Sequence, residues 1–280
     1  MAKQRPTGKC KLCGEVKLLC DSHYMPKRIY AFLAARQLKN PNPVMDGRGG
    51  LRQISDQYRG YVFCQKCEDL LNKNGEKWVL ANIPKGYDAP FPLQDALAPL
   101  NPVIIGNDCN VYDVSVTKAF DVKKLVYFGI SVFWRGAVHC WKTSTGQEAP
   151  TVDLAEYETQ MREFILGIGP FPSNVILTID IWPYKKVLQA MQPVTTANLQ
   201  ACGRLWFYVP GLTYSLYVGP NLSAGIKAIN AVRGIVKVDL VTGKSVYDYV
   251  TIPLKNGVEN PKMKDLAQEI AFVRSHLTKQ

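Results

Sequence analysis

The stretch that decides the fold of the N-terminal third is KCKLCGEVKLLCDSHYMPK, residues 9–27. It holds three of the eight cysteines in the chain and one of the three histidines. Cysteine thiolates and imidazoles are ligands that zinc prefers, so the stretch predicts a metal site. It opens with a Cys-x-x-Cys pair, Cys10 and Cys13, and a second pair with the same spacing, Cys64 and Cys67, follows later in the chain.

Two sets of ligands compete for this metal. The two pairs together form a Cys₄ site, because a tight turn presents both sulfurs of a pair to one tetrahedral ion. The rival is a local Cys₃His site made of Cys10, Cys13, Cys20 and His23. Its shorter loop favours it by only about 2 kcal/mol, which is small against the roughly 10–16 kcal/mol of structural zinc binding. We favour the Cys₄ site, because the local site strands the second pair; buried thiols without a metal are the third alternative.

The positive charge of the chain is concentrated in the same region. Of the net charge of +11, the first 82 residues carry +8, from 15 Lys and Arg against 7 Asp and Glu. A basic region attracts polyanions, and nucleic acid is the commonest such partner. Ordinary solubility charge is the alternative.

The chain carries no recognisable targeting or membrane segment. Its start lacks the apolar core of a signal peptide, and the longest apolar run, residues 125–134, is about half the length that crosses a bilayer. We therefore expect a cytoplasmic protein without a membrane partner. Disulfides are rare in that compartment, which favours metal binding by the Cys-x-x-Cys pairs.

Composition and periodicity divide the chain into three parts. The 280 residues are 47% hydrophobic, which suits a folded protein with a sizeable core. We expect a charged, cysteine-rich domain over residues 1–83, a proline-rich connector over 84–117 and a second domain over 118–280. In the first domain we expect a helix over 26–39, a flexible glycine-rich loop over 46–50, a strand over 61–64 and a helix over 67–83 that is interrupted near Gly75.

The second domain is predicted to be α+β with an antiparallel sheet. Its first helix is apolar nearly all round, which indicates burial. The expected helices cover 118–141, 153–166 and 260–277, and the expected strands cover 174–182, 204–210, 213–219 and 234–241.

The order of features between residues 10 and 82 resembles the zinc-stabilised branch of the HNH endonucleases. A Cys-x-x-Cys pair is followed by a segment with Asp, His and Pro (DSHYMP, 21–26), a glycine-rich loop, a strand, a second Cys-x-x-Cys pair and a helix. The resemblance implies a zinc-braced ββα-metal unit at the N-terminus, ahead of the α+β domain. In that family the first histidine activates water for attack on a phosphodiester, one divalent ion assists, and the zinc is structural.

The catalytic residues that the resemblance implies are His23, Asp21 and Glu68. His23 matches the general base, and the pKa of an imidazole suits that work. Asp21 resembles the metal-binding aspartate, although Ser22 separates it from the histidine. Glu68 stands directly after the second pair, where the family often has His or Asn, and a carboxylate suits Mg²⁺ or Mn²⁺. The central asparagine of the family has no evident counterpart.

The predicted helix after the second pair supplies further candidates. Glu68, Asn72 and Glu76 are four residues apart, so they share one face and, with Asp21, are candidate ligands of the catalytic ion. A solvated helix face is the alternative. Basic residues that we expect to contact phosphate are Lys27, Arg28, Arg59, Lys66, Lys73 and Lys77.

These features imply a metal-dependent endonuclease that hydrolyses phosphodiester bonds of nucleic acid, DNA before RNA, with structural Zn²⁺ and catalytic Mg²⁺ or Mn²⁺. Analogy suggests a bacterial restriction or phage-defence component whose C-terminal domain selects the target or forms a homo-oligomer. The separated aspartate and the missing asparagine favour an alternative, a catalytically inactive zinc-stabilised nucleic-acid-binding or scaffold protein. Thiol redox chemistry at the cysteine pairs is a third hypothesis.

Overall fold

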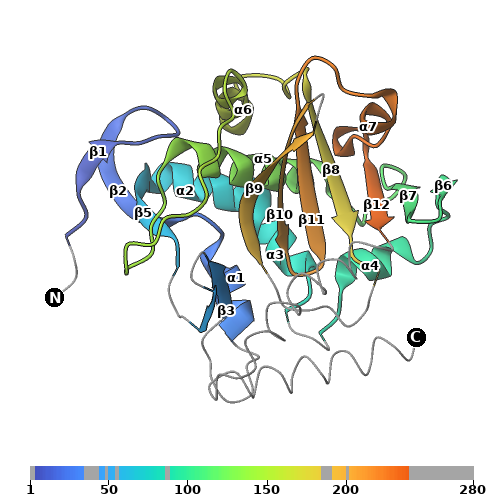
Figure 1. Cartoon of the computed structure of the whole chain (residues 1–280), viewed down its shortest axis with the longest axis horizontal. Helices are drawn as coiled ribbons and strands as arrows, with labels where there is room; N and C mark the ends of the chain where they lie inside the picture. The colour runs from blue at the N-terminus through green and yellow to red at the C-terminus, as the bar shows by residue number, and fades with distance from the viewer. Residues whose placement is uncertain are drawn as a thin grey trace.

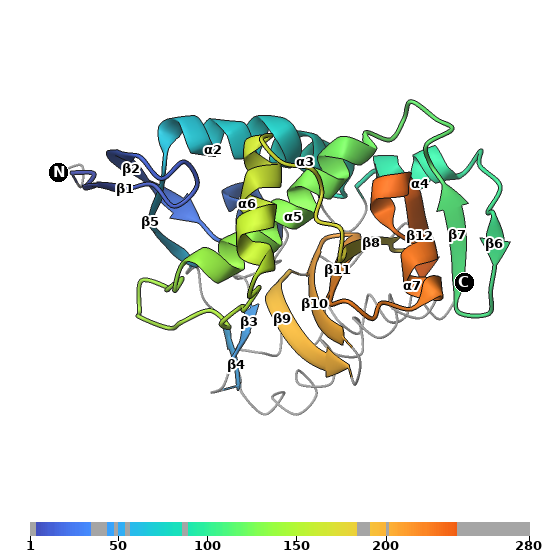
Figure 2. The ribbon, with the colours of Figure 1, turned by 90° about the horizontal axis from the view of Figure 1, so that it is seen from above.

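The described residues of this computed structural model form a small three-stranded sheet, a large seven-stranded sheet and a two-stranded hairpin (Figure 1). Seen from above in Figure 2, the small sheet lies at the left, the large sheet lies at the right, and the long helix α5 crosses the molecule between them. The structure describes residues 4–34, 44–47, 50–53, 57–85, 89–183, 191–199 and 202–239.

The small sheet has three antiparallel strands in the order β1-β2-β5. A tight turn joins β1 to β2, and Gly14 within it has φ +79°, a conformation that a side chain would strain. The register between β2 and β5 shifts after Leu19, so a bulge bends the pair. The strands are β1 (Thr7–Lys9), β2 (Val16–His23) and β5 (Arg59–Cys64).

A helical rod with a π-helical turn in its middle follows β5 without a loop. The interruption expected near Gly75 is this wide turn, and the helix continues beyond it. A Cβ at Gly75 would lie 3.0 Å from the backbone of Phe128, so the glycine lets α5 approach closely. The rod consists of α2 (Gln65–Leu71), the π turn η1 (Asn72–Glu76) and α3 (Lys77–Asn82).

The chain between β2 and β5 carries a helix and a hairpin. The helix expected over 26–39 is present from Lys27 to Ala34, and the remainder lies outside the described residues. Of the flexible loop expected over 46–50, residues 46, 47 and 50 instead pair in antiparallel strands, and 48–49 lie outside the described residues. The elements are α1 (Lys27–Ala34), β3 (Val44–Gly47) and β4 (Gly50–Gln53).

The segment expected to be a connector, residues 84–117, contains a helix and two strands. Both strands join the large sheet, where β7 pairs with β12 and β6 pairs with β7. The division of the chain into two domains stays a prediction. The elements are α4 (Pro92–Leu97), β6 (Ile104–Ile105) and β7 (Cys109–Asp113).

The large sheet has seven strands in the order β6-β7-β12-β8-β11-β10-β9, and its neighbours are antiparallel except for β12 and β8. The mixed α+β class and the antiparallel sheet are confirmed, whereas β6, β7 and β9 were not expected. The helix expected over 260–277 lies outside the described residues. The remaining strands are β8 (Val175–Ile181), β9 (Gln192–Leu199), β10 (Cys202–Val209), β11 (Leu212–Val218) and β12 (Ile235–Asp239).

Helix α5 (Val122–Val138) packs against both sheets, which explains its apolar surface. On the large sheet, the ring of Phe133 lies 4.9 Å from that of Phe207, centre to centre. On the small sheet, Trp134 stacks on Phe63 of β5 at 5.8 Å. The helices α6 (Tyr157–Leu166) and α7 (Ala224–Ala228) and the 3₁₀ turn η2 (Ala231–Arg233) complete the described elements. No described helix has the length and apolar character that a membrane span needs.

Candidate metal centre and its neighbours

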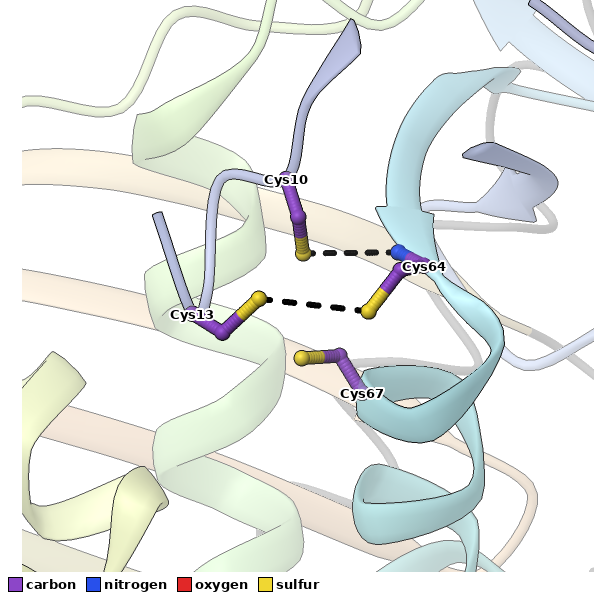
Figure 3. A group of neighbouring side chains, drawn as sticks. All are labelled: Cys10, Cys13, Cys64 and Cys67. Atoms are coloured by element: carbon purple, nitrogen blue, oxygen red, sulfur yellow. Dashed lines mark hydrogen bonds between the residues drawn. The ribbon is translucent and has the colours of Figure 1, made fainter. Parts of the chain in front are cut away.

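Four cysteine side chains meet where the β1–β2 turn contacts the junction of β5 and α2 (Figure 3). Their sulfur atoms all lie within 4.8 Å of one another. The sulfurs of Cys13 and Cys64 are 3.9 Å apart. A tetrahedral ion with Zn–S bonds of about 2.3 Å places its sulfurs roughly 3.8 Å apart. Cys10, Cys13, Cys64 and Cys67 are therefore positioned to bind a metal ion, and the donor set is one that structural zinc uses.

Backbone hydrogen bonds hold the cysteine turn in shape. The amide of Gly14 donates to the carbonyl of Cys10 at 2.9 Å, and the amide of Cys10 donates to the carbonyl of Glu15 at 2.8 Å. The amide of Cys64 donates to the sulfur of Cys10 at 3.3 Å (Figure 3). An amide that points at sulfur favours the thiolate, which is the form that binds metal.

The protonation of the thiols is set by burial and by these amides. Burial acts to raise the pKa of Cys10, but the amides of Cys13 and Cys64 outweigh it, and the net shift is downward. Burial raises the pKa of Cys67 strongly. A bound metal has to displace these protons, so occupancy of the cluster will depend on pH.

The local Cys₃His set is not assembled. The buried thiol of Cys20 donates to Oε1 of Gln65 at 3.4 Å and accepts from the guanidinium of Arg5 at 3.6 Å. Neither Cys20 nor His23 belongs to the group of four sulfurs. In the part of the chain that the structure describes, that group is the one cluster of three or more His, Cys, Asp and Glu side chains that can hold a metal.

His23 is the last residue of β2 and lies opposite Arg59 of β5. Asp21, two residues earlier on the strand, accepts a hydrogen bond from the Arg59 guanidinium at 3.3 Å. Burial lowers the pKa of His23; Asp21 opposes the shift, whereas the cations of Lys27, Arg59 and Arg135 reinforce it. The imidazole is therefore neutral at neutral pH, and a neutral imidazole can accept a proton.

Glu68 lies in the first turn of α2, close to the buried Ser22 of β2. Its Oε1 is buried and has no hydrogen-bond partner within the described part of the chain. Burial raises the pKa of Glu68, while Arg135 and the hydroxyl of Ser22 act against that rise. The oxygen of Ser22 also accepts from the amide of Phe63 at 3.2 Å. An orphaned carboxylate oxygen of this kind suits a cation or a proton.

Arg135 of α5 reaches into the same region and was not anticipated from the sequence. Its side chain is 2% exposed and forms an ion pair with Glu76 at the end of η1. One guanidinium nitrogen also donates to the carbonyl of Tyr24 at 3.5 Å. The sequence signal was a single arginine at the end of the apolar run in the helix, because a buried charge requires a partner.

The residues expected to hold a catalytic divalent ion lie in different surroundings. Asp21 is exposed and paired with Arg59, Glu76 is paired with Arg135, and Asn72 is exposed on the π turn. Glu68 alone among them offers a buried oxygen without a described partner. The role of these residues as ligands stays a prediction.

The basic residues expected to contact phosphate all lie on the surface. Their exposure is compatible with binding and equally with a solvated face, so their role also stays a prediction. Lys66 lies on α2, Lys73 on η1 and Lys77 on α3, along the same rod. The full set is Lys27, Arg28, Arg59, Lys66, Lys73 and Lys77.

Comparison with known proteins gives no match to any family model, any curated protein or any solved structure. The resemblance to the HNH endonucleases therefore gains no support from relatives.

Proposed function

We propose that this protein is a metal-dependent endonuclease that hydrolyses phosphodiester bonds of nucleic acid, with DNA preferred to RNA. The observation that carries the proposal is the position of His23. The four cysteines brace the β2–β5–α2 unit without using this histidine, and the pKa of His23 is lowered by burial. A strand–strand–helix unit with a neutral histidine at its rim is the arrangement that the HNH resemblance implies.

In the proposed reaction, His23 takes a proton from a water molecule as that water attacks the phosphorus. The oxygen on the opposite side of the phosphorus leaves with the electron pair of the broken bond. Bound Mg²⁺ or Mn²⁺ would supply charge stabilisation at the phosphate. Glu68 fits that ion through its unpartnered buried oxygen, whereas Glu76 does not, because its charge is already matched by Arg135.

The test is cleavage of supercoiled plasmid with Mg²⁺ or Mn²⁺, together with zinc per chain on the same preparation. We expect the wild type to nick the plasmid and His23→Ala to lose at least about 100-fold of the rate while keeping its zinc. His139→Gln is the histidine control: His139 follows α5 and touches β5 at Gly60 but is not part of β2, so it shows whether loss of any histidine beside the small sheet lowers cleavage. Undiminished cleavage by His23→Ala would exclude this histidine as the base.

A second candidate is a zinc-stabilised nucleic-acid-binding protein without catalysis. The ion pairs of Asp21 with Arg59 and of Glu76 with Arg135 favour it, because they engage two of the three predicted carboxylate ligands. This candidate predicts a gel shift that needs no Mg²⁺, weakens steeply with salt and is never accompanied by cleavage. Nicking by the wild type that His23→Ala abolishes would exclude it.

A further inference from the structure

A depression of about 380 Å³ lies beside the four-cysteine centre. One wall is the end of β1 and the cysteine turn, and the other is helix α6. The lining residues are Lys9, Cys10, Lys11, Gly14 and Arg162. Three of these five residues are cationic, and none of them belongs to the basic set expected from the resemblance.

The cationic groups of the depression are anchored to the cysteine turn. Nε of Arg162 donates to the carbonyl of Leu12 at 2.6 Å, which fixes the guanidinium against the turn. Its Nη2 lies 3.6 Å from the point where a Cβ on Gly14 would stand, so the glycine leaves that space open. The amide of Lys11 donates to the carbonyl of Val62 at 3.1 Å, which places this lysine on the rim.

The balance of charge in the depression favours an anion. Within the described ranges, Lys9, Lys11 and Arg162 form no ion pair, whereas the nearby Glu15 is paired with Lys17. Four thiolates around one Zn²⁺ would carry two negative charges beneath the floor, and three cations exceed them. A guanidinium with its Nη groups available offers the fork of donors that phosphate accepts.

We propose that this depression binds a phosphate group of the nucleic-acid backbone, away from the site of cleavage. The choice of nucleic acid as the ligand rests on the proposed function and on the charge of +8 in residues 1–82. The depression adjoins the start of β2, and His23 is its last residue. Seven steps along a strand at about 3.3 Å each separate the two ends by roughly 23 Å.

This separation sets a minimum length for the substrate. Phosphates along one strand of a duplex advance by about 3.4 Å per nucleotide, so roughly 23 Å corresponds to roughly seven nucleotides. A duplex of about twelve base pairs can reach both the depression and His23, whereas a duplex of about four base pairs cannot. Lys9 and Lys11 therefore assist cleavage only when the nucleic acid is long enough to span both places.

The experiment measures binding by fluorescence anisotropy in Mg²⁺-free buffer, so that cleavage does not interfere. The variant Lys9→Gln/Lys11→Gln is compared with the wild type on a labelled twelve-base-pair duplex over a range of salt. We expect weaker binding and a slope of log K against log salt that is shallower by about 0.9 for each phosphate that the variant no longer neutralises. Unchanged affinity and slope would overturn the proposal.

The control is the double variant Lys227→Gln/Arg233→Gln, which removes two charges from α7 and the η2 turn that follows it; α7 lies on the opposite side of the molecule from β1 in Figures 1 and 2. We expect it to leave affinity and salt slope unchanged. An equal loss of affinity in both variants would mean that the loss comes from net charge and not from the depression, and would overturn the proposal. Arg162→Gln is a second test of the same site, interpreted only with a full zinc content because Arg162 also supports the turn.

Two further measurements, pyrophosphate binding and plasmid cleavage, distinguish this proposal from a small-anion site and from the proposed nuclease function. If pyrophosphate binds the wild type but not Lys9→Gln/Lys11→Gln, while duplex binding is equal in both, the depression is a small-anion site and the proposal fails. If plasmid cleavage depends on His23 but binding is indifferent to Lys9 and Lys11, the proposed function stands and this inference alone fails. Binding that depends on both lysines without any cleavage supports the inference and contradicts the nuclease.

Discussion

The small and the large sheet are stabilised by different chemistry. The small sheet has three strands, of which β1 covers three residues, and its turn and helix are joined through four cysteines. In the large sheet, all seven residues of β8 are buried, and the ring of Phe207 lies between those of Phe133 and Tyr214 at 4.9 and 4.8 Å. Short elements that bury little apolar area need a further constraint, and a metal ion bound by the four cysteines would supply it.

The two sheets nevertheless share one core through α5. Trp134 packs on the small sheet and Phe133 on the large sheet, and both belong to one continuous cluster of buried side chains. We therefore expect the small sheet to unfold when the metal is lost and the large sheet to unfold when its core packing is lost. Because α5 contacts both sheets, it determines whether unfolding of one destabilises the other.

The largest effect is expected at the metal centre. Cys67→Ser removes one of four sulfurs, so we expect loss of bound zinc and of most of its contribution to folding, on the order of 10 kcal/mol in structural zinc sites. The measurements are zinc per chain and thermal unfolding. Cys20→Ser is the matched control, because Cys20 lies outside the cluster, and it should retain a full equivalent of zinc.

A zinc equivalent retained by Cys67→Ser but lost by Cys20→Ser would restore the local Cys₃His set. The counterpart in the large sheet is Phe207→Ala, which should lower stability by about 3–5 kcal/mol while leaving the zinc in place. Release of zinc by Phe207→Ala below its unfolding temperature would show that the two sheets fail as one unit.

An intermediate effect is expected at the ion pair that joins Arg135 of α5 to Glu76 of η1. Arg135→Met leaves the carboxylate of Glu76 in a partly buried position without its cation, and breaking such a pair costs about 3–5 kcal/mol. Glu76→Gln in the same background should recover part of that loss, because the unpaired charge is gone. The free energy of unfolding of both single variants and of the double variant measures the coupling. Strictly additive losses would contradict a direct ion pair.

The smallest effect is expected from pH at the contact between α5 and the small sheet. His139 lies against Gly60, where a Cβ would stand 2.6 Å from the imidazole Nε2. Burial lowers the pKa of His139, and Lys11 and Lys142 lower it further. Below about pH 6.5 the unfolded chain therefore binds the extra proton and the folded chain does not, so stability falls as pH falls through that window.

The measurement is the difference in free energy of unfolding between the wild type and His139→Gln, taken from about pH 8 to about pH 5.5. Taking the difference removes the pH dependence of metal binding, which both proteins share. We expect the variant to lose less stability than the wild type on acidification. A steeper loss in the variant would mean that the imidazole gains a proton on folding, contrary to its surroundings.

Much of the local structure was predictable, because residues close together in the sequence determine it. Alternation of apolar residues located β8, β10, β11 and β12, and the apolar run located α5. The Cys₄ grouping was predictable for the same reason, since two-residue spacing is a local constraint. Strands β7 and β9 escaped notice because their apolar pattern is weak, and pairing with β12 and β10 defines them.

The surroundings of the candidate catalytic residues were not predictable, because residues distant in sequence create them. Arg135 lies 59 positions after its partner Glu76, so no local pattern joins them. The four-residue spacing from Glu68 to Glu76 assumed a regular helix, and the π turn between them changes which side chains share a face. Asp21 meets Arg59, and Glu68 lies near Ser22 and Arg135, only once β2, β5 and α5 pack together.

The route of the chain between His23 and Arg59 has a consequence for how this protein can be altered. The two residues are paired neighbours in the sheet, so the intervening segment begins and ends at one place. Doubling the length of such a segment adds only about 0.6 kcal/mol of closure entropy. A reporter domain or an affinity tag that lengthens the chain between these two residues should therefore leave the four-cysteine centre assembled.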